Sequence, residues 1–263
     1  MKIGISTGCL YPMTTENAVR TLLEHGFTIF EIFFNTFSEL EPDYIDRLNS
    51  LFEKYNAEVH SIHPFTSSYE SYLLFSAYER RFHDGIKFYE MYFRTAARLN
   101  AKKVVLHGMR DAFVSISDEE YCRRFLLLSR RAACYGIEFL QENVDQFYSN
   151  RPIFLKEMRR IIPEYAGFVL DVKQALRGGH SPCEFARIMG DKLRHVHISD
   201  CSPTGGCVLP GKGCFDYSEF FSTLKEIKYE GDVIIEVYRT SYENISDLAE
   251  AGNFLSKFIR NKE

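Results

Sequence analysis

The chain has 263 residues, 45% of them hydrophobic and 15% aromatic, so it can bury a large core and is not intrinsically disordered. Its formal net charge of −4 argues against a nucleic-acid partner, which usually requires a basic face. The N-terminus lacks a signal-peptide pattern, and no apolar run approaches the roughly 20 residues that a membrane helix needs. Seven scattered cysteines without a CxxC pair favour a reducing compartment. We therefore expect a cytoplasmic protein that binds neither nucleic acid nor membranes.

The first half of the chain alternates short apolar strands with amphipathic helices. Strands are predicted at 2–6, 28–34, 57–63 and 102–108. A helix runs from Thr14 to a stop at Gly26, and Pro42 opens the next one. The aromatic-rich segment 69–99 has a helical period but is longer than one ordinary helix, so we expect a broken helix there, and it is also a candidate homodimer contact.

The second half repeats this alternation. Ser117 and Glu120 form a capping box that starts a helix over 118–135. Further strands are predicted at 136–143, 167–171, 194–198 and 232–237, and further helices at 152–162, from Pro182, at 216–227 and at 245–260. Eight strands alternating with helical segments, without a linker, predict one (β/α)8 TIM barrel domain over residues 1–263. A doubly wound open sheet is the alternative, but it would not explain polar side chains at so many strand ends.

Four of the predicted strands end in side chains that bind metals. Their last inward positions carry Glu142, Asp171, His197 and Glu236, because side chains alternate along a strand. His63 and His107 hold the same position on two other strands. Catalytic groups of such barrels project from the carboxyl ends of the strands. Carboxylates packed together repel, so we expect one divalent cation there, of which Mn²⁺, Zn²⁺, Mg²⁺ and Co²⁺ all tolerate this ligand set.

Two other groups of residues are weaker candidates. Cys201, Cys207 and Cys214 crowd one segment and are zinc-ligand types, but their spacing matches no compact zinc module. Gly-rich turns at 178–179 and 211–213 are either plain tight turns or cradles whose N–H groups bind a phosphate.

Six stretches, in this order and spacing, carry a resemblance to the sugar phosphate isomerase/epimerase family, which has the xylose-isomerase-like barrel and is related to the ketose 3-epimerases and to endonuclease IV. They are VVLHG (104–108), LQEN (140–143), VLDVKQA (169–175), HVHISD (195–200), LPGKG (209–213) and IIEVY (234–238). The ketose 3-epimerases bind one divalent metal through Glu, Asp, His and Glu. The resemblance places these ligands on Glu142, Asp171, His197 and Glu236.

The resemblance implies a metal-dependent isomerase or epimerase of a sugar or sugar phosphate. Glu142 and Glu236 would be the catalytic residues, one removing a proton and the other returning it through an enediolate. Two substrate-binding residues of the ketose epimerases are replaced here, a His by Gln174 and an Arg by Pro203. The substrate contacts expected in this chain are His63, His107, Lys173, Gln174 and Arg239.

Two alternatives stay open. Endonuclease IV proteins hold extra zinc ions where this chain has His63 and His107, which suggests a metal-dependent phosphodiesterase. Gln174 replaces a further histidine ligand of those enzymes, which argues against it. The other alternative is a non-catalytic sugar-binding barrel.

Overall fold

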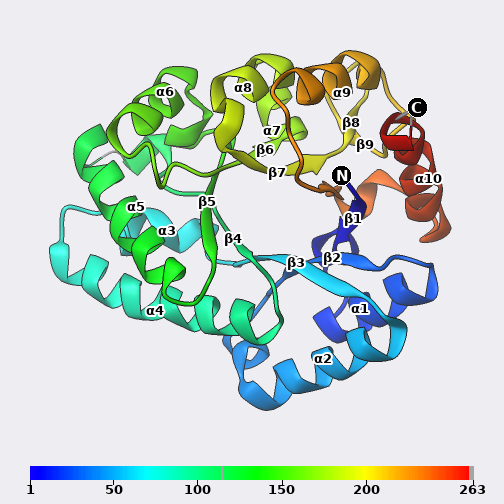
Figure 1. The fold of residues 1–263 in the computed structure, drawn as a ribbon, viewed down its shortest axis with the longest axis horizontal. Coiled ribbons are helices and arrows are strands. Elements are labelled where there is room, and N and C mark those ends of the chain that lie inside the picture. Colours follow the sequence, from blue (N-terminus) through cyan, green and yellow to red (C-terminus); the bar gives the residue numbers. More distant parts are fainter. Residues whose placement is uncertain (114, 261–263) are drawn as a thin grey trace.

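Eight parallel strands close into a barrel in the computed structural model, which describes residues 1–113 and 115–260. The strand order is β1-β10-β7-β6-β5-β4-β3-β2, so β1 (blue in Figure 1) lies beside β10 (orange) and closes the ring. The strands are β1 (Ile3–Ser6), β2 (Ile29–Phe33), β3 (Glu58–His63), β4 (Lys103–Leu106), β5 (Glu138–Glu142), β6 (Phe168–Asp171), β7 (Leu193–Ile198) and β10 (Val233–Ile235). The predicted (β/α)8 barrel is confirmed, and the open sheet is wrong.

Helices connect the strands and surround the barrel (Figure 1). They are α1 (Thr15–Glu24), α2 (Pro42–Tyr55), α3 (Ser67–Leu73), α4 (Glu79–Arg98), α5 (Asp118–Ala133), α6 (Pro152–Ile161), α7 (Val172–Arg177), α8 (Pro182–Met189), α9 (Tyr217–Glu226) and α10 (Ser246–Arg260). The broken helix over 69–99 is confirmed as α3 and α4. The predicted cap of α5 is also present, since the Ser117 side chain accepts a hydrogen bond from the Glu120 amide. No helix in the described residues is both long and apolar enough to cross a bilayer.

A short α-helix and a hairpin, neither of them predicted from the sequence, follow strands that end in candidate ligands. Helix α7 begins immediately after β6 because the Asp171 carboxylate accepts a hydrogen bond from the Gln174 amide and caps its first turn. A short antiparallel hairpin, β8 (Asp200–Cys201) and β9 (Cys207–Val208), follows β7.

The interior of the barrel is layered. Val105, Leu140 and Val169 form a small buried cluster separate from the main core between strands and helices. Each lies two residues before a polar residue at its strand end, so it points to the same side of the sheet. This apolar layer forms part of the floor beneath the polar residues at the carboxyl ends of the strands.

Candidate functional site

The four residues predicted as metal ligands meet at the carboxyl end of the barrel. One ligand atom each from Glu142, Asp171, His197 and Glu236 lies within 4.8 Å of the others. His197 Nδ1 is 3.1 Å from a Glu142 oxygen, 3.4 Å from a Glu236 oxygen and 3.9 Å from an Asp171 oxygen. Glu142, Asp171 and His197 are each 1% exposed. We call these four residues the ligand cluster.

Strand register explains why the ligand cluster forms. Asp171 and His197 are paired across β6 and β7, and Ile234, two residues before Glu236, is paired with His197 across β7 and β10. The Asn143 side chain links the end of β5 to β6. Its Nδ2 donates to the Asp171 carbonyl, and its Oδ1 accepts from the Asp171 backbone N–H at 2.7 Å. The backbone thus holds the ligand-bearing strand ends at one level.

Lys173, on the first turn of α7, points back into the ligand cluster. It is 6% exposed, and its ammonium donates to both Asp171 Oδ2 and Glu236 Oε2. Burial alone would lower the pKa of Lys173, but the charges of Asp171, Glu236 and Glu142 raise it well above its ordinary value. Sequence reasoning expected Lys173 to contact substrate, and its position against two of the carboxylates was not foreseen.

The ligand cluster brings three carboxylates together around one imidazole, an arrangement that fits a divalent cation. Burial, only partly offset by Lys173, raises the pKa of Asp171 to about 8. By contrast, the positive charges of Lys173 and His197 overcome burial and lower the pKa of Glu236 to about 2. The charges of Glu236 and Glu142 add to the effect of burial on Asp171, so the raised pKa of Asp171 reflects the crowding of the three carboxylates. The donor set of three carboxylates and one imidazole suits the divalent ions named above.

His63 and His107 contact Glu142 through Oε2, whereas His197 contacts Oε1 of the same carboxylate. Glu142 Oε2 lies 3.0 Å from His107 Nε2 and 3.5 Å from His63 Nε2, and these two nitrogens are 3.0 Å apart. The other His63 nitrogen, Nδ1, lies 3.0 Å from the Pro64 carbonyl, to which it donates. Burial would lower the pKa of His63, but the hydrogen bond and charge of Glu142 raise it to about 9. The group has the ligand types of a second cation site.

A cavity of about 300 Å³ opens above the ligand cluster. It is lined by both carboxylates predicted to move protons, Glu142 and Glu236, and by four of the five predicted substrate contacts. Those four are His63, His107, Lys173 and Gln174. Aromatic side chains of Tyr11, Phe33 and Tyr238 complete the wall. A cavity of this size and mixed lining can hold a small polyhydroxy compound.

Arg239 is the predicted substrate contact that the structure does not bring to the cavity. Its guanidinium donates to the carbonyls of Tyr242 and Glu243 and lies over the Tyr242 ring, 4.7 Å from the ring centre. The chain turns at Arg239–Ser241, with three residues between the end of β10 and this turn, and the Arg239 side chain bonds within this loop. Arg177 instead donates a 2.6 Å hydrogen bond to the hydroxyl of Tyr238, which lines the cavity.

The Gly-rich turns are plain turns and not phosphate cradles. The amides of Gly211 and Gly213 both donate to Asp200 Oδ2, at 3.0 and 3.1 Å. The amides of Gly178 and Gly179 donate to carbonyls of helix α7. Since these N–H groups already have partners, the cradle hypothesis is wrong for both turns.

The cysteine zinc hypothesis receives no support. Cys201 Sγ and Cys214 Sγ lie 3.7 Å apart. Among residues 1–113 and 115–260, no group of three potential metal ligands includes a cysteine.

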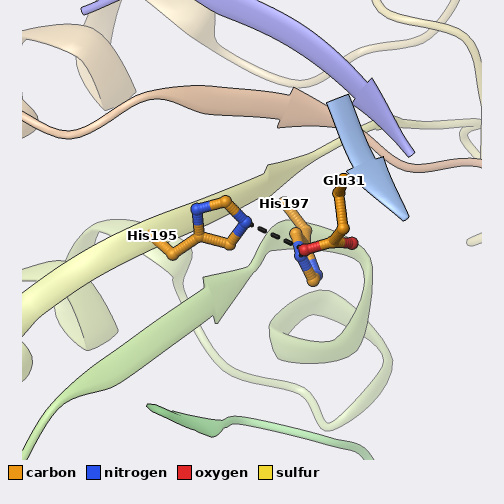
Figure 2. A group of neighbouring side chains, drawn as sticks. All are labelled: Glu31, His195 and His197. Atoms are coloured by element: carbon orange, nitrogen blue, oxygen red, sulfur yellow. Dashed lines mark hydrogen bonds and ion pairs between the residues drawn. The ribbon is translucent and has the colours of Figure 1, made fainter. Parts of the chain in front are cut away.

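Sequence reasoning missed one carboxylate, Glu31 on β2. It is 0% exposed and contacts His195 and His197 of β7 (Figure 2). A charged residue in the middle of the apolar stretch at 28–34 was the available signal, since a Glu inside a buried strand needs partners.

Comparisons with known proteins agree with this architecture. A family model described as xylose isomerase-like TIM barrel matches residues 19–258. An uncharacterized protein of Methanocaldococcus jannaschii is 25% identical over 272 residues, covering 98% of this chain and 89% of that protein. A crystal structure of a D-tagatose 3-epimerase-like protein superposes with a TM-score of 0.80 at 24% identity, covering 98% of this chain and 97% of that one. A structure of the IolI protein with a bound zinc atom gives a TM-score of 0.75 at 23% identity, covering 98% and 96%.

Proposed function

Because this chain belongs to the xylose isomerase-like TIM barrel family, we propose that it is a divalent-metal-dependent isomerase or epimerase of a sugar or sugar phosphate. One observation carries the proposal: three carboxylates converge on the Nδ1 atom of a buried histidine at the base of a cavity of about 300 Å³. The names of structural neighbours, a 3-epimerase-like protein and a zinc-bound barrel, support it.

The residues that would hold the cation are Glu142, Asp171, His197 and Glu236. A bound divalent ion would lower the pKa of the C–H between a carbonyl and a hydroxyl of the sugar and would stabilise the enediolate. Glu142 extends from the end of β5, and Glu236 follows β10, with β6 and β7 between them in the barrel order. They therefore approach the cavity from different directions.

Proton transfer is the step that we assign to Glu142 and Glu236. One carboxylate removes the proton from carbon, and the electron pair of the broken C–H bond moves to form the enediolate. The other carboxylate, carrying a proton taken up from solvent, delivers it to carbon as the enediolate electron pair forms the new C–H bond, and the first carboxylate then releases its proton to solvent. Return to the same carbon from the opposite face gives an epimer, and return to the neighbouring carbon gives an isomer. His63, His107, Lys173 and Gln174 line the cavity and would hydrogen-bond the hydroxyl and carbonyl oxygens of the substrate.

The test combines metal content with solvent exchange. The purified protein is expected to hold about one divalent ion per chain, and Glu236→Gln is expected to lose it. Glu243→Gln, a matched change of an exposed residue in the next loop, should keep it. Incubation in deuterium oxide with a panel of sugars and sugar phosphates should then place deuterium on one carbon of the true substrate. Failure to bind any metal after loading with Mn²⁺ or Zn²⁺ would refute the proposal.

A second candidate, a metal-dependent phosphodiesterase, is favoured by one observation only. His63, His107 and Glu142 form a second group of potential ligands beside the ligand cluster. Two or three ions per chain, together with cleavage of an abasic DNA strand, would favour this activity. Stabilisation by a sugar without deuterium exchange would instead indicate a binding-only barrel.

A further inference from the structure

A buried hydrogen-bond network lies on the far side of His197 from the other three ligands. It consists of Glu31 on β2, Ser61 on β3 and His195 on β7, together with His197, and we call it the Glu31 network. Glu31, Ser61 and His195 are each 0% exposed. Figure 2 shows the Glu31 carboxylate facing both imidazoles of β7.

One carboxylate oxygen collects every hydrogen bond made to the Glu31 side chain among the described residues. Glu31 Oε2 accepts from Ser61 Oγ at 2.8 Å and from the Nε2 atoms of His195 and His197, each at 3.0 Å. The other oxygen, Oε1, is buried and has no partner in the described part of the chain. Burying a carboxylate costs free energy unless hydrogen-bond donors compensate its charge. The three donors therefore fix the position of the Glu31 carboxylate.

The two nitrogens of His197 have opposite surroundings. Nε2 faces Glu31, whereas Nδ1 faces the carboxylates of Glu142, Asp171 and Glu236. When Nε2–H donates to Glu31, the neutral ring has its lone pair on Nδ1. The Nδ1 lone pair and the carboxylate oxygens around it are all electron-pair donors, so a divalent cation between them would be their common partner.

We propose that Glu31 is a positioning residue that fixes His197 as an Nδ1 metal ligand. The inference rests on the proposed function, because it assumes that the ligand cluster binds a cation. Glu31 acts through His197: its hydrogen bond selects the tautomer with Nε2 protonated and holds the ring plane toward the cluster. A carboxylate behind a metal-binding imidazole also increases the basicity of the ligand nitrogen. Ser61 and His195 hold the Glu31 carboxylate in place.

The test compares metal affinity in Glu31→Gln and Ser61→Ala. Both substitutions alter the Glu31 network, but Ser61→Ala keeps the hydrogen bond between Glu31 and His197. Dissociation constants for Mn²⁺ and Zn²⁺ are measured by competition with a chromophoric chelator, on protein shown to be folded by its unfolding midpoint. We expect affinity to fall about 10- to 100-fold in Glu31→Gln, the usual effect of losing such a partner. Ser61→Ala should change it by less than about threefold, since the ligand hydrogen bond remains.

Nitrogen NMR of the wild-type protein gives a readout that does not depend on a variant folding. In the zinc-loaded protein labelled with ¹⁵N-histidine, we expect His197 to carry a proton on Nε2 and to coordinate through Nδ1. Coordination through Nε2 would overturn the inference.

The remaining outcomes separate this inference from the proposed function. Unchanged affinity in Glu31→Gln with a lowered unfolding midpoint would show a purely structural role and overturn the inference alone. Loss of a second bound ion in that variant, with the first retained at full affinity, would show that Glu31 is itself a ligand and would also overturn it. No metal binding by the wild-type protein would refute the proposed function, and the inference with it.

Discussion

The Lys173→Met substitution is expected to tighten metal binding, because it removes a cation already placed among the ligands. The Lys173 ammonium bonds Asp171 Oδ2 and Glu236 Oε2, the same oxygens that face His197 Nδ1. An incoming divalent ion must displace this ammonium from both oxygens. Methionine has a similar length and fills the same space without the charge.

The expected change in metal affinity follows from the free-energy cost of Lys173→Met in the ion-free protein and in the metal-loaded protein. Removing one partner of a buried ion pair typically costs about 3–5 kcal/mol. The Glu236 side chain is 15% exposed, and water reduces the expected cost in the ion-free protein to about 2 kcal/mol. In the metal-loaded protein the bound cation compensates the carboxylates, so the same substitution costs little. The difference corresponds to a rise in affinity of roughly 30-fold.

Two independent measurements must agree. Urea unfolding with and without Mn²⁺ gives the stability of the ion-free and loaded forms, and chelator competition gives the affinity. Lys212→Met, which changes an exposed lysine of the neighbouring loop, is the matched control and should alter neither. If Lys173→Met binds Mn²⁺ no more tightly than the wild-type protein, the ammonium does not compete with the ion and the reasoning is refuted.

Two further predictions concern residues outside the ligand cluster. His60 forms a hydrogen bond with Asp232 at the opposite end of the barrel. This bond raises the pKa of His60 despite burial. Burial would raise the pKa of Asp232, but the bond outweighs it and lowers that pKa to about 2. Because the pKa of His60 is raised on folding, its contribution to stability is fully present below the unfolded-state pKa of about 6.5 and is lost as pH rises through the folded-state pKa. The lowered pKa of Asp232 contributes stability above the unfolded-state pKa of about 3.9. His60→Gln should therefore cost about 1–2 kcal/mol in urea unfolding at pH 5 and much less at pH 9, and an equal deficit at both would contradict the assignment. Arg239→Ala should leave KM for the identified substrate within about twofold, since its guanidinium bonds only carbonyls of its own loop and the Tyr242 ring in the described structure. A tenfold rise in KM would show that this side chain reaches the substrate after all.

The sequence by itself determined the barrel and the location of the ligand cluster. Strand periodicity and the alternation with helices are local properties, and parallel strands of a barrel bring their carboxyl ends to one edge. Glu142, Asp171, His197 and Glu236 each stand at or just beyond a strand end, so their convergence could be predicted without distances. Their role as metal ligands remains a prediction that the proposed measurements test.

The tertiary structure alone decided how the charges around the site are arranged. Glu31 and His197 are 166 residues apart, and only closure of the barrel brings them to 3.0 Å. The Lys173 side chain reaches two carboxylates because it lies on the first turn of the helix that Asp171 caps. The Arg239 side chain does not line the cavity, because it bonds carbonyls of its own loop. Local patterns say which face of a strand a residue occupies. Which distant group compensates a buried charge depends on contacts that form only in the closed barrel.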